Sequence, residues 1–487
     1  MKHDPIVVPE QTLVQRALGG HAALGLLAGG LLYLIALSGM LVVIHERWQR
    51  WEQPTVVETP GIAPAAVQAA VATKAGMDAR AGKPASTHLY VKMPTAGLPR
   101  TVVTSDHGAI YVDSDGRAAG PEAHAWTEFL VNLHTYLHLP MTIGIILVGA
   151  LGVMLAALAI TGVVAHPRIL RDAFRLRPRG NRQLAHADWH NRLGVWTLPF
   201  VLALAMTGAI IGLSSVGADL LGKRYHGGDT LAAYAPIFGA EHPVDKRPAP
   251  LPNVAAPLAY MAAAYPDVTP TYVTIHDPGT RGQNIQLLAA HDRRLIYGEA
   301  YHFNAAGQYQ DRLGLSDGPL GRQTAASLYN LHFGNFGGLA VELAYIAFGL
   351  ALCVVTATGM SLWLQKRRRR GLPSPRLEGF WTMVVWGTPV LIVATLWLRG
   401  VSGAEMPLVP VFWCGLAALI VAGMVVPKLA DARALRLVLA AMIAVTALVH
   451  FTLTPLGLPA VWAIDLALLG VAAVLAAVEL GRKRATA

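Results

Sequence analysis

The feature that most constrains this chain is a series of long apolar stretches. Eight of them are long enough to cross about 30 Å of hydrocarbon as a helix. They lie at residues 22–44, 139–165, 193–216, 343–364, 379–398, 407–427, 437–455 and 457–478. Of the 487 residues, 54% are hydrophobic and only 14% are charged, which is too apolar for a soluble protein of this length. We therefore expect a mainly α-helical, polytopic membrane protein with eight transmembrane helices.

The placement of basic residues indicates the orientation of these helices. The formal net charge is +10, but Lys and Arg gather in short loops, with six in 167–185 and six in 364–378. Short loops rich in Lys and Arg stay on the cytoplasmic side of a membrane. Both termini are therefore expected in the cytoplasm, and the long segments 47–130 and 217–330 on the outer side. Because the charge reports topology, we expect no nucleic-acid partner.

The two cysteines exclude some chemistry. Cys353 and Cys414 both lie within predicted spans, and the chain contains no CxxCH or CxxC motif. Disulfide bonds, covalent haem attachment and thiolate metal sites are therefore not expected. The first span is too long for the apolar core of a signal peptide, so we expect it to be retained.

The two long outer segments resemble one another. Each begins with a short predicted helix, at 64–75 and 257–268. Each then has three stretches rich in β-branched and aromatic residues, which predict strands. These are THLYVKM, RTVVTS and GAIYVDSDG in the first segment and TPTYVTIHD, NIQLLAAHD and LIYGEAYHFNAAG in the second. We therefore expect two small α+β domains.

The four membrane spans that flank these segments carry a second duplication. Spans one and three each begin with HxxLG and reach a hydroxyl residue and a glycine 17 and 18 positions after the histidine. Spans two and four each follow Asn-Leu-His and contain Thr-Gly. The four histidines are His21, His190, His134 and His332, and the hydroxyl–glycine pairs are Ser38-Gly39, Thr207-Gly208, Thr161-Gly162 and Thr358-Gly359. The first four spans are thus a duplicated unit of helix, outer domain and helix.

Equivalent histidines of the two units are expected to face one another at two depths. His21 and His190 stand near the cytoplasmic face, and His134 and His332 near the outer face. Two neutral imidazoles that face one another across a helical bundle are the usual axial ligands of a b-type haem. We therefore predict two b-type haems, with iron held by His21 and His190 at one depth and by His134 and His332 at the other.

Other histidines remain candidates for these positions. The alternates are His138, His186, His45 and His166. The first two stand four residues from a predicted ligand and share its helix face. The other two lie at the far ends of spans one and two. A histidine at a helix end can also serve only as an interfacial anchor. Spacings of i,i+4 also suit zinc, but no HExxH motif is present.

The expected division of the chain has six parts. They are 1–46 (N-terminus and first span), 47–130 (first outer domain), 131–216 (spans two and three), 217–330 (second outer domain), 331–370 (span four) and 371–487 (four additional spans). In the last part Asp465 lies mid-span with His450 as its expected partner, either on a proton or quinol path or in one buried hydrogen bond between helices. An aromatic belt is expected from Trp48, Trp51, Trp126, Trp189, Trp363 and Trp381.

Taken together, these motifs resemble the PepSY-associated transmembrane family. The set comprises HxxLG…SG at His21, NLH…TG at His134, HNRLG…TG at His190 and NLHFGNFGG…TG at His332, with PepSY-like αβ domains in both outer segments. The resemblance covers roughly residues 1–370, and the four additional helices depart from it. It implies a di-haem oxidoreductase of a bacterial inner membrane that reduces Fe(III) held by a siderophore or other chelate in the periplasm and releases Fe(II).

Partners and two alternative functions stay open. The cytoplasmic loops are too short for a flavin or nicotinamide domain, and GxGxxG is absent, so a separate cytoplasmic partner or a membrane quinol is expected to donate electrons. One alternative is a component of an iron or siderophore transporter, which predicts carboxylates, Met or Cys along a path. The other is a non-haem PepSY regulatory or scaffold protein that binds a peptide or protease through its outer domains.

Overall fold

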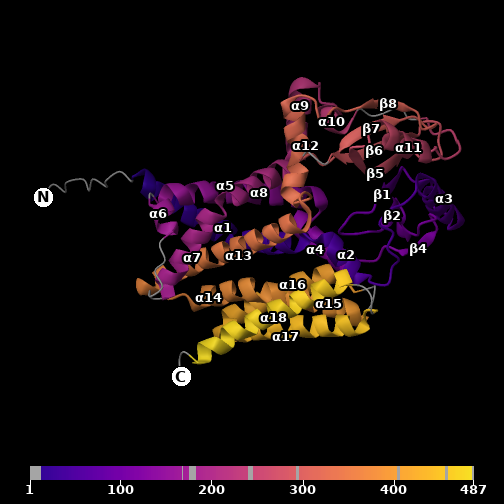
Figure 1. The fold of residues 1–487 in the computed structure, drawn as a ribbon. Coiled ribbons are helices and arrows are strands. Elements are labelled where there is room, and N and C mark those ends of the chain that lie inside the picture. Colours follow the sequence, from indigo (N-terminus) through magenta and orange to yellow (C-terminus); the bar gives the residue numbers. More distant parts are fainter. Residues whose placement is uncertain are drawn as a thin grey trace.

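The computed structural model describes residues 12–166, 168–174, 182–239, 245–291, 295–402, 406–455 and 459–484. Long helices run side by side, and a β-sheet with its own helices lies beyond one end of them (Figure 1). We call this the sheet end of the long helices and the opposite one the far end. The expectation of a mainly α-helical protein with many long apolar helices is confirmed.

Two repeat units follow one another along the chain. The first contains α1 (Leu13–Val42), α2 (His45–Glu52), α3 (Pro64–Arg80), β1 (His88–Lys92), β2 (Thr101–Ser105), β3 (Gly108–Val112), β4 (Ala118–Pro121), α4 (Ala125–Tyr136) and α5 (Met141–Ala165). After α6 (Ile169–Ala173), the second contains α7 (Arg182–Trp196), α8 (Leu198–Gly212), α9 (Ser214–Tyr225), α10 (Thr230–Phe238), α11 (Ala255–Ala264), β5 (Val268–His276), β6 (Asn284–His291), β7 (Glu299–Phe303), β8 (Tyr309–Arg312), α12 (Leu320–Phe333) and α13 (Gly338–Arg369). Both outer helices and all six strand-like stretches of the sequence are present, and each unit has one further strand.

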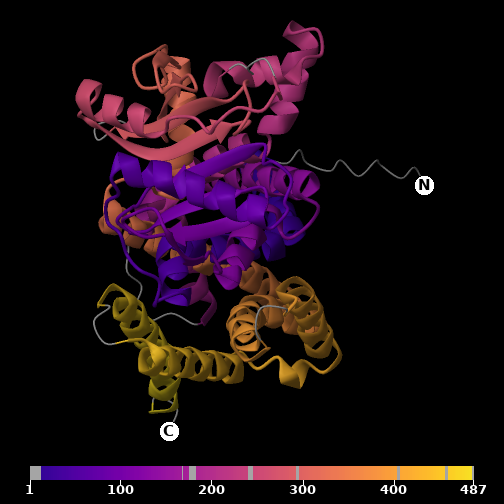
Figure 2. The same ribbon diagram turned by 90° about the vertical axis from the view of Figure 1, so that its right-hand side faces the viewer.

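The rest of the chain forms what we call the C-terminal helices. They are α14 (Pro375–Thr382), a π-helix (Met383–Gly387), α15 (Thr388–Ser402), α16 (Leu408–Val425), a short 3-10 helix (Pro427–Leu429), α17 (Ala432–Leu453) and α18 (Pro459–Arg484). Seen from the sheet end, they lie to one side of the sheet and are not covered by it (Figure 2). They dock on the first unit through Val385 of the π-helix, whose carbonyl accepts a 2.7 Å hydrogen bond from the Tyr33 hydroxyl.

The described helices correct one of the predicted spans. Seven are long and apolar enough to cross a membrane by length and composition. The stretch predicted at 193–216 is instead a bent pair, because α7 and α8 meet at an angle of 66°. Pro199 stands in the first turn of α8, and proline lacks the N–H that an uninterrupted helix needs. The expected eight spans are reached only if the bent pair counts as one.

The strands of both units form one sheet instead of two separate ones. Its order is β4-β3-β2-β1-β5-β6-β7-β8, and all neighbours are antiparallel. The units join where β1 pairs with β5, with Leu89 opposite Ile275 and Val91 opposite Val273. An exposed strand edge leaves backbone groups without partners, and this pairing satisfies them for both units. The sequence could not reveal it, because each strand reads the same whether its neighbour belongs to its own unit or to the other.

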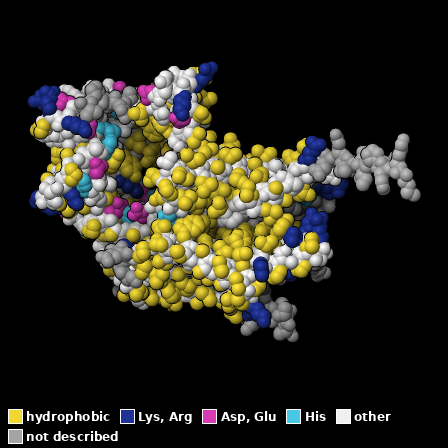
Figure 3. Space-filling model, turned by 180° about the vertical axis from the view of Figure 1, so that it is seen from behind, with side chains coloured by type: hydrophobic (Ala, Val, Ile, Leu, Met, Phe, Trp, Pro, Cys, Tyr) yellow, Lys and Arg dark blue, Asp and Glu magenta, His cyan; other side chains and the backbone are white. Residues whose placement is uncertain are grey.

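The sheet has one covered and one open face. Leu89, Val91, Val273 and Ile275 are almost fully buried in a core with residues of α3 and α11. Residues that alternate with them, such as Tyr90, lie on the opposite face, which turns toward the long helices (Figure 1). Seen from behind, the molecule is hollowed between this face and the long helices, and His, acidic and basic side chains gather around the hollow (Figure 3).

Four of the predicted belt tryptophans are part of the protein interior. Trp48, Trp51, Trp126 and Trp381 are only 3 to 6% exposed and belong to the core between the first unit and the C-terminal helices. The belt prediction is therefore wrong for them. Their position at span ends is correct, but helices from elsewhere in the chain cover the rings that would otherwise meet lipid. Trp189, at 56% exposed, remains consistent with a belt.

Candidate functional site

The four histidines of the duplicated motifs lie in two pairs. His21 of α1 faces His190 of α7 toward the far end, with ring centroids 6.2 Å apart. His134 of α4 faces His332 of α12 at the sheet end, with ring centroids 6.3 Å apart. Each pair joins equivalent positions of the two units. The structure therefore brings together the residues that the sequence pairs, and we call them the far-end pair and the sheet-end pair.

A hydroxyl–glycine pair of a neighbouring helix holds each imidazole. His21 Nδ1 lies 3.0 Å from the carbonyl oxygen of Leu158 and 3.3 Å from Oγ1 of Thr161. A carbonyl oxygen only accepts, so Nδ1 carries the proton and donates it. The Thr161 hydroxyl donates to the carbonyl of Ala157 at 2.6 Å, so its oxygen accepts from the ring as well. In the neutral imidazole this leaves Nε2 with a lone pair that a metal can use.

The other three imidazoles are held in the same way. Nδ1 of His134 donates to the Ile35 carbonyl at 3.1 Å and to the Ser38 hydroxyl at 3.3 Å. Nδ1 of His190 donates to the Val355 carbonyl at 2.9 Å and to the Thr358 hydroxyl at 3.3 Å. His332 donates to the Leu204 carbonyl and, at 3.0 Å, to the Thr207 hydroxyl. In every case the carbonyl residue precedes the hydroxyl residue by three positions, one helical turn. A carbonyl partner of this kind fixes the tautomer and orientation of a metal-binding imidazole.

The glycine after each hydroxyl residue makes room for the ring. A methyl group added at the glycine would approach Cε1 of the imidazole to 2.8 Å for Gly39 and His134, 3.3 Å for Gly162 and His21, 2.8 Å for Gly208 and His332, and 3.0 Å for Gly359 and His190. Carbon atoms in contact are normally about 3.5 to 4.0 Å apart, so a β-carbon would displace the ring. Sequence reasoning did not assign this role, although the fourfold recurrence of hydroxyl and glycine was its signal.

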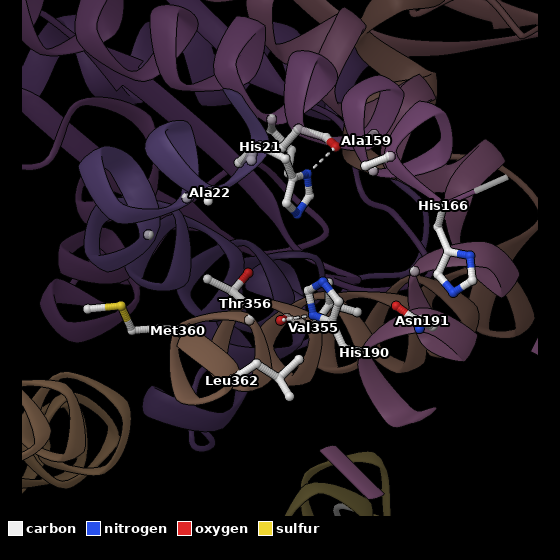
Figure 4. Close-up of a pocket in the computed structure, with 18 of the residues that line it drawn as sticks. His21, Ala22, Ala159, His166, His190, Asn191, Val355, Thr356, Met360 and Leu362 are labelled. Carbon is white, nitrogen blue, oxygen red and sulfur yellow. Dashed lines mark hydrogen bonds between the residues drawn. The ribbon is translucent and has the colours of Figure 1, made fainter. Parts of the chain in front are cut away.

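A cavity surrounds the far-end pair. Its volume is about 450 Å³, within the range of small-molecule and cofactor sites. The second ring nitrogens of His21 and His190 point toward one another across it (Figure 4). Most of the wall is apolar, and glycines keep it open at Gly25, Gly29, Gly162, Gly194 and Gly359. The cavity therefore suits a flat, largely apolar ligand that both imidazoles can reach.

The spacing of both pairs fits one metal ion between two rings. A metal–imidazole bond is about 2.0 Å, and a ring nitrogen lies about 1 Å from the ring centroid. Two imidazoles on opposite sides of one metal therefore have centroids roughly 6 Å apart, as observed for both pairs. Within the described ranges, no three His, Cys, Asp or Glu residues form a cluster for a metal ion. Each pair could supply two imidazole ligands to one metal ion, the number that a b-type haem iron takes from a protein.

The two pairs lie at different depths along the long helices. On α1, His21 belongs to the far-end pair and Ser38 contacts His134 of the sheet-end pair. These 17 residues correspond to about 25 Å of helix at 1.5 Å per residue. Leu137 and His138 both have a φ of 55°, so α4 ends there and does not continue into α5. His134 thus depends on its own short helix and on α1 for its position.

The four alternate histidines lie outside both pairs. The ring of His138 stacks on Phe129 with centroids 4.7 Å apart. His45 Nδ1 lies 3.2 Å from the carbonyl oxygen of Val42 in its own turn. The amide of Gln365 contacts His186. His166 lines the far-end cavity at its edge, away from the facing nitrogens (Figure 4).

Comparison with known proteins identifies the family of the chain. Residues 19–366 match the family described as the PepSY-associated TM region. This range contains both histidine pairs and ends before the C-terminal helices. An uncharacterised protein of Pseudomonas aeruginosa is 28% identical over 270 residues, which are 52% of this chain and 66% of that protein. The chain therefore matches a little under two thirds of that relative's length. On the family match, this chain belongs to the PepSY-associated TM region family.

Proposed function

We propose that this chain is a di-haem reductase of a bacterial inner membrane, which moves electrons from the cytoplasmic side to a ferric siderophore or another Fe(III) chelate in the periplasm. His21 and His190 would hold one b-type haem near the cytoplasm, and His134 and His332 a second near the periplasm. The observation that carries the proposal is the fourfold imidazole geometry, with matching pair separations of 6.2 and 6.3 Å. When bound, the haems supply one-electron carriers at two depths of the membrane.

The residues around each imidazole prepare it for this role. The carbonyl that accepts from Nδ1 makes the ring a stronger electron donor through Nε2 and holds it in one tautomer. The hydroxyl gives a second acceptor and limits rotation of the ring, and the glycine lets the ring approach the helix backbone. Because the four settings are alike, they support ligation at both depths and argue against four unrelated interfacial anchors.

The hollow between the open face of the sheet and the long helices offers a place for the ferric chelate (Figure 3). Ring contacts run from His332 through Phe333 and Tyr329 to Tyr297, which shortly precedes β7, with centroid separations of 5.6, 5.7 and 5.5 Å. These three rings are 36 to 41% exposed. Each ferric ion would accept one electron there and become Fe(II). The hard oxygen ligands of a siderophore hold Fe(II) more weakly than Fe(III), so iron would leave the chelate.

A charged pair stands on the open face of the sheet near these rings. Lys92 Nζ lies 2.7 Å from Oε1 of Glu46. Burial by itself would raise the pKa of Glu46, but Lys92 and the Thr95 hydroxyl together hold that pKa below its usual value. Glu46 is therefore ionised at neutral pH and neutralises Lys92.

The first test is the visible absorption spectrum of the purified protein. We expect two haems per chain, the α band of a reduced b-type haem after addition of dithionite, and loss of that band when a ferric hydroxamate is added. A bipyridyl reagent should trap one Fe(II) for each electron removed. A colourless protein from porphyrin-replete cells would contradict the proposal and favour the scaffold alternative. Haem that stays reduced, combined with uptake of intact chelate into vesicles, would favour the transporter alternative.

The orientation of the rings predicts two distinct signals in electron paramagnetic resonance. The imidazole planes are 82° apart in the far-end pair and 24° apart in the sheet-end pair. Two iron d orbitals can interact with the π systems of the imidazoles. Near-parallel imidazole planes interact with the same one of these orbitals, so the two orbitals differ in energy. Perpendicular planes interact with one orbital each, so the two orbitals stay close in energy. We therefore expect a rhombic low-spin signal from the periplasmic site and a more axial one from the cytoplasmic site. A single signal of two equivalent haems would show that the rings adopt the same orientation.

A further inference from the structure

Two buried ion pairs connect α17 with α18, one toward each end. Toward the far end, Arg436 Nε lies 2.7 Å from Oε1 of Glu479, which is 2% exposed. The Arg436 guanidinium also lies over the ring of Trp386 in the π-helix, which likewise belongs to the C-terminal helices. Toward the sheet end, His450 Nδ1 lies 2.9 Å from Oδ2 of Asp465, which is fully buried. The contact between His450 and Asp465 that the sequence predicts is thus present.

The sheet-end ion pair differs because it reaches into the first repeat unit. Trp51 of α2 donates from Nε1 to Oδ1 of Asp465 at 2.8 Å. His450 Nε2 lies 2.9 Å from the backbone carbonyl oxygen of Trp51, and the two rings stack with centroids 4.1 Å apart. One buried carboxylate and its histidine therefore hold both the side chain and the backbone of Trp51.

Glu52, which follows Trp51, connects α2 to α4. The Glu52 carboxylate accepts from the backbone N–H groups of Trp126 and Thr127 at 3.1 and 2.7 Å, and also from the Thr127 hydroxyl. These are N–H groups of the first turn of α4, which have no partner inside the helix. The Trp126 indole adds a 3.2 Å hydrogen bond to the carbonyl of Ile392 in α15. The start of α4 is thus tied to α2 and to the C-terminal helices, and the same helix ends near His134.

The second repeat unit holds its equivalent helix differently. In α12, Asn330 donates from its side chain to the carbonyl of Ile296 at 2.7 Å, a contact with the segment before β7. The equivalent Asn132 precedes His134 by the same two residues. The helices that carry the sheet-end pair thus have different contacts, since α12 reaches the segment before β7 through Asn330, whereas the first turn of α4 reaches α2 and α15.

We propose that Asp465 is a positioning residue and that the C-terminal helices serve to hold α2 and α4 so that the His134 ring stays opposite His332. The inference extends the proposed function, since it concerns the geometry of the periplasmic haem site. It assigns a role to the four helices that lie outside the matched family region. It also explains why an ionisable group is tolerated in a membrane helix, because the carboxylate is fully paired by His450 and Trp51.

The test compares Asp465→Leu and Trp51→Phe with Glu479→Leu, which breaks the matched ion pair without touching α2. Amide hydrogen exchange of residues 125–136 can be compared among the variants in the haem-free protein, so this readout does not require bound haem. We expect it to be roughly tenfold faster in Asp465→Leu, somewhat faster in Trp51→Phe and unchanged in Glu479→Leu, because only the first two remove a hydrogen bond that anchors α2. In the haem-loaded protein, the rhombic signal should change in the first two variants while the axial signal stays.

The outcomes separate this inference from the proposed function. Unchanged exchange and an unchanged rhombic signal in Asp465→Leu would overturn the positioning role and leave the reductase proposal intact. Equal effects of Asp465→Leu and Glu479→Leu would also overturn it, because they would show a general loss of stability. Faster exchange confined to residues 125–136, in a protein that binds no haem, would support the anchoring of α4 and defeat the reductase proposal alone. If Asp465→Leu does not fold, Trp51→Phe decides, since it keeps the ion pair.

Discussion

Replacing His332 by alanine is expected to lower the haem content from two per chain to about one and to abolish reduction of ferric chelate. The rhombic electron paramagnetic resonance signal should disappear, because His332 belongs to the pair whose imidazole planes are 24° apart. Its Nδ1 donates to the Leu204 carbonyl and the Thr207 hydroxyl, and its ring faces that of His134. Alanine has no group that can take over iron ligation.

The matched control is His138→Ala. His138 lies two residues beyond the end of α4, but its ring stacks on Phe129 and lies outside both pairs. We expect this variant to keep two haems and the rhombic signal. Haem content is measured from the pyridine haemochrome spectrum per mole of protein. Two haems in His332→Ala, or one haem in His138→Ala, would show that the ligand assignment is wrong.

Replacing Gly39 by alanine is expected to empty the same site although it removes no ligand. The added β-carbon would lie 2.8 Å from Cε1 of His134, well inside normal contact, and would push the ring from its place beside Ser38. In a helix without such a contact, glycine to alanine is favourable by about 1 kcal/mol. The expected loss is therefore opposite in sign to the intrinsic helix propensity, which makes the result diagnostic.

Gly30→Ala is the control on the same helix. Apart from its chain neighbours and the adjacent helix backbone, no described atom lies within 4 Å of a β-carbon at Gly30, so this variant should keep both haems and unfold at an equal or slightly higher temperature. Haem content and thermal unfolding in detergent measure the two effects together. If Gly39→Ala binds haem as the wild type does, the glycine serves helix packing alone and the proposed role of the hydroxyl–glycine pairs is incorrect.

The sequence predicted the pairing of histidines because duplication is visible in one dimension. Once His21 and His190 stand at equivalent places of two copies, an approximate two-fold relation brings them together whatever the details of the loops. The same reasoning did not identify the role of Ser38 and Gly39. They serve His134, which lies 96 residues from Ser38 along the chain, and no local pattern specifies such a contact.

Hydrophobicity along the chain determined which segments form long apolar helices, and repetition determined that two units share one plan. Both properties depend on single residues and their spacing, because transfer to lipid and helix formation are local free energies. Only the tertiary structure decided that the sheets merge through β1 and β5, that four belt tryptophans are buried, and that the Asp465 carboxylate holds α2. These features arise from contacts between distant segments, where burial and hydrogen bonding select one partner among many that the sequence leaves equivalent.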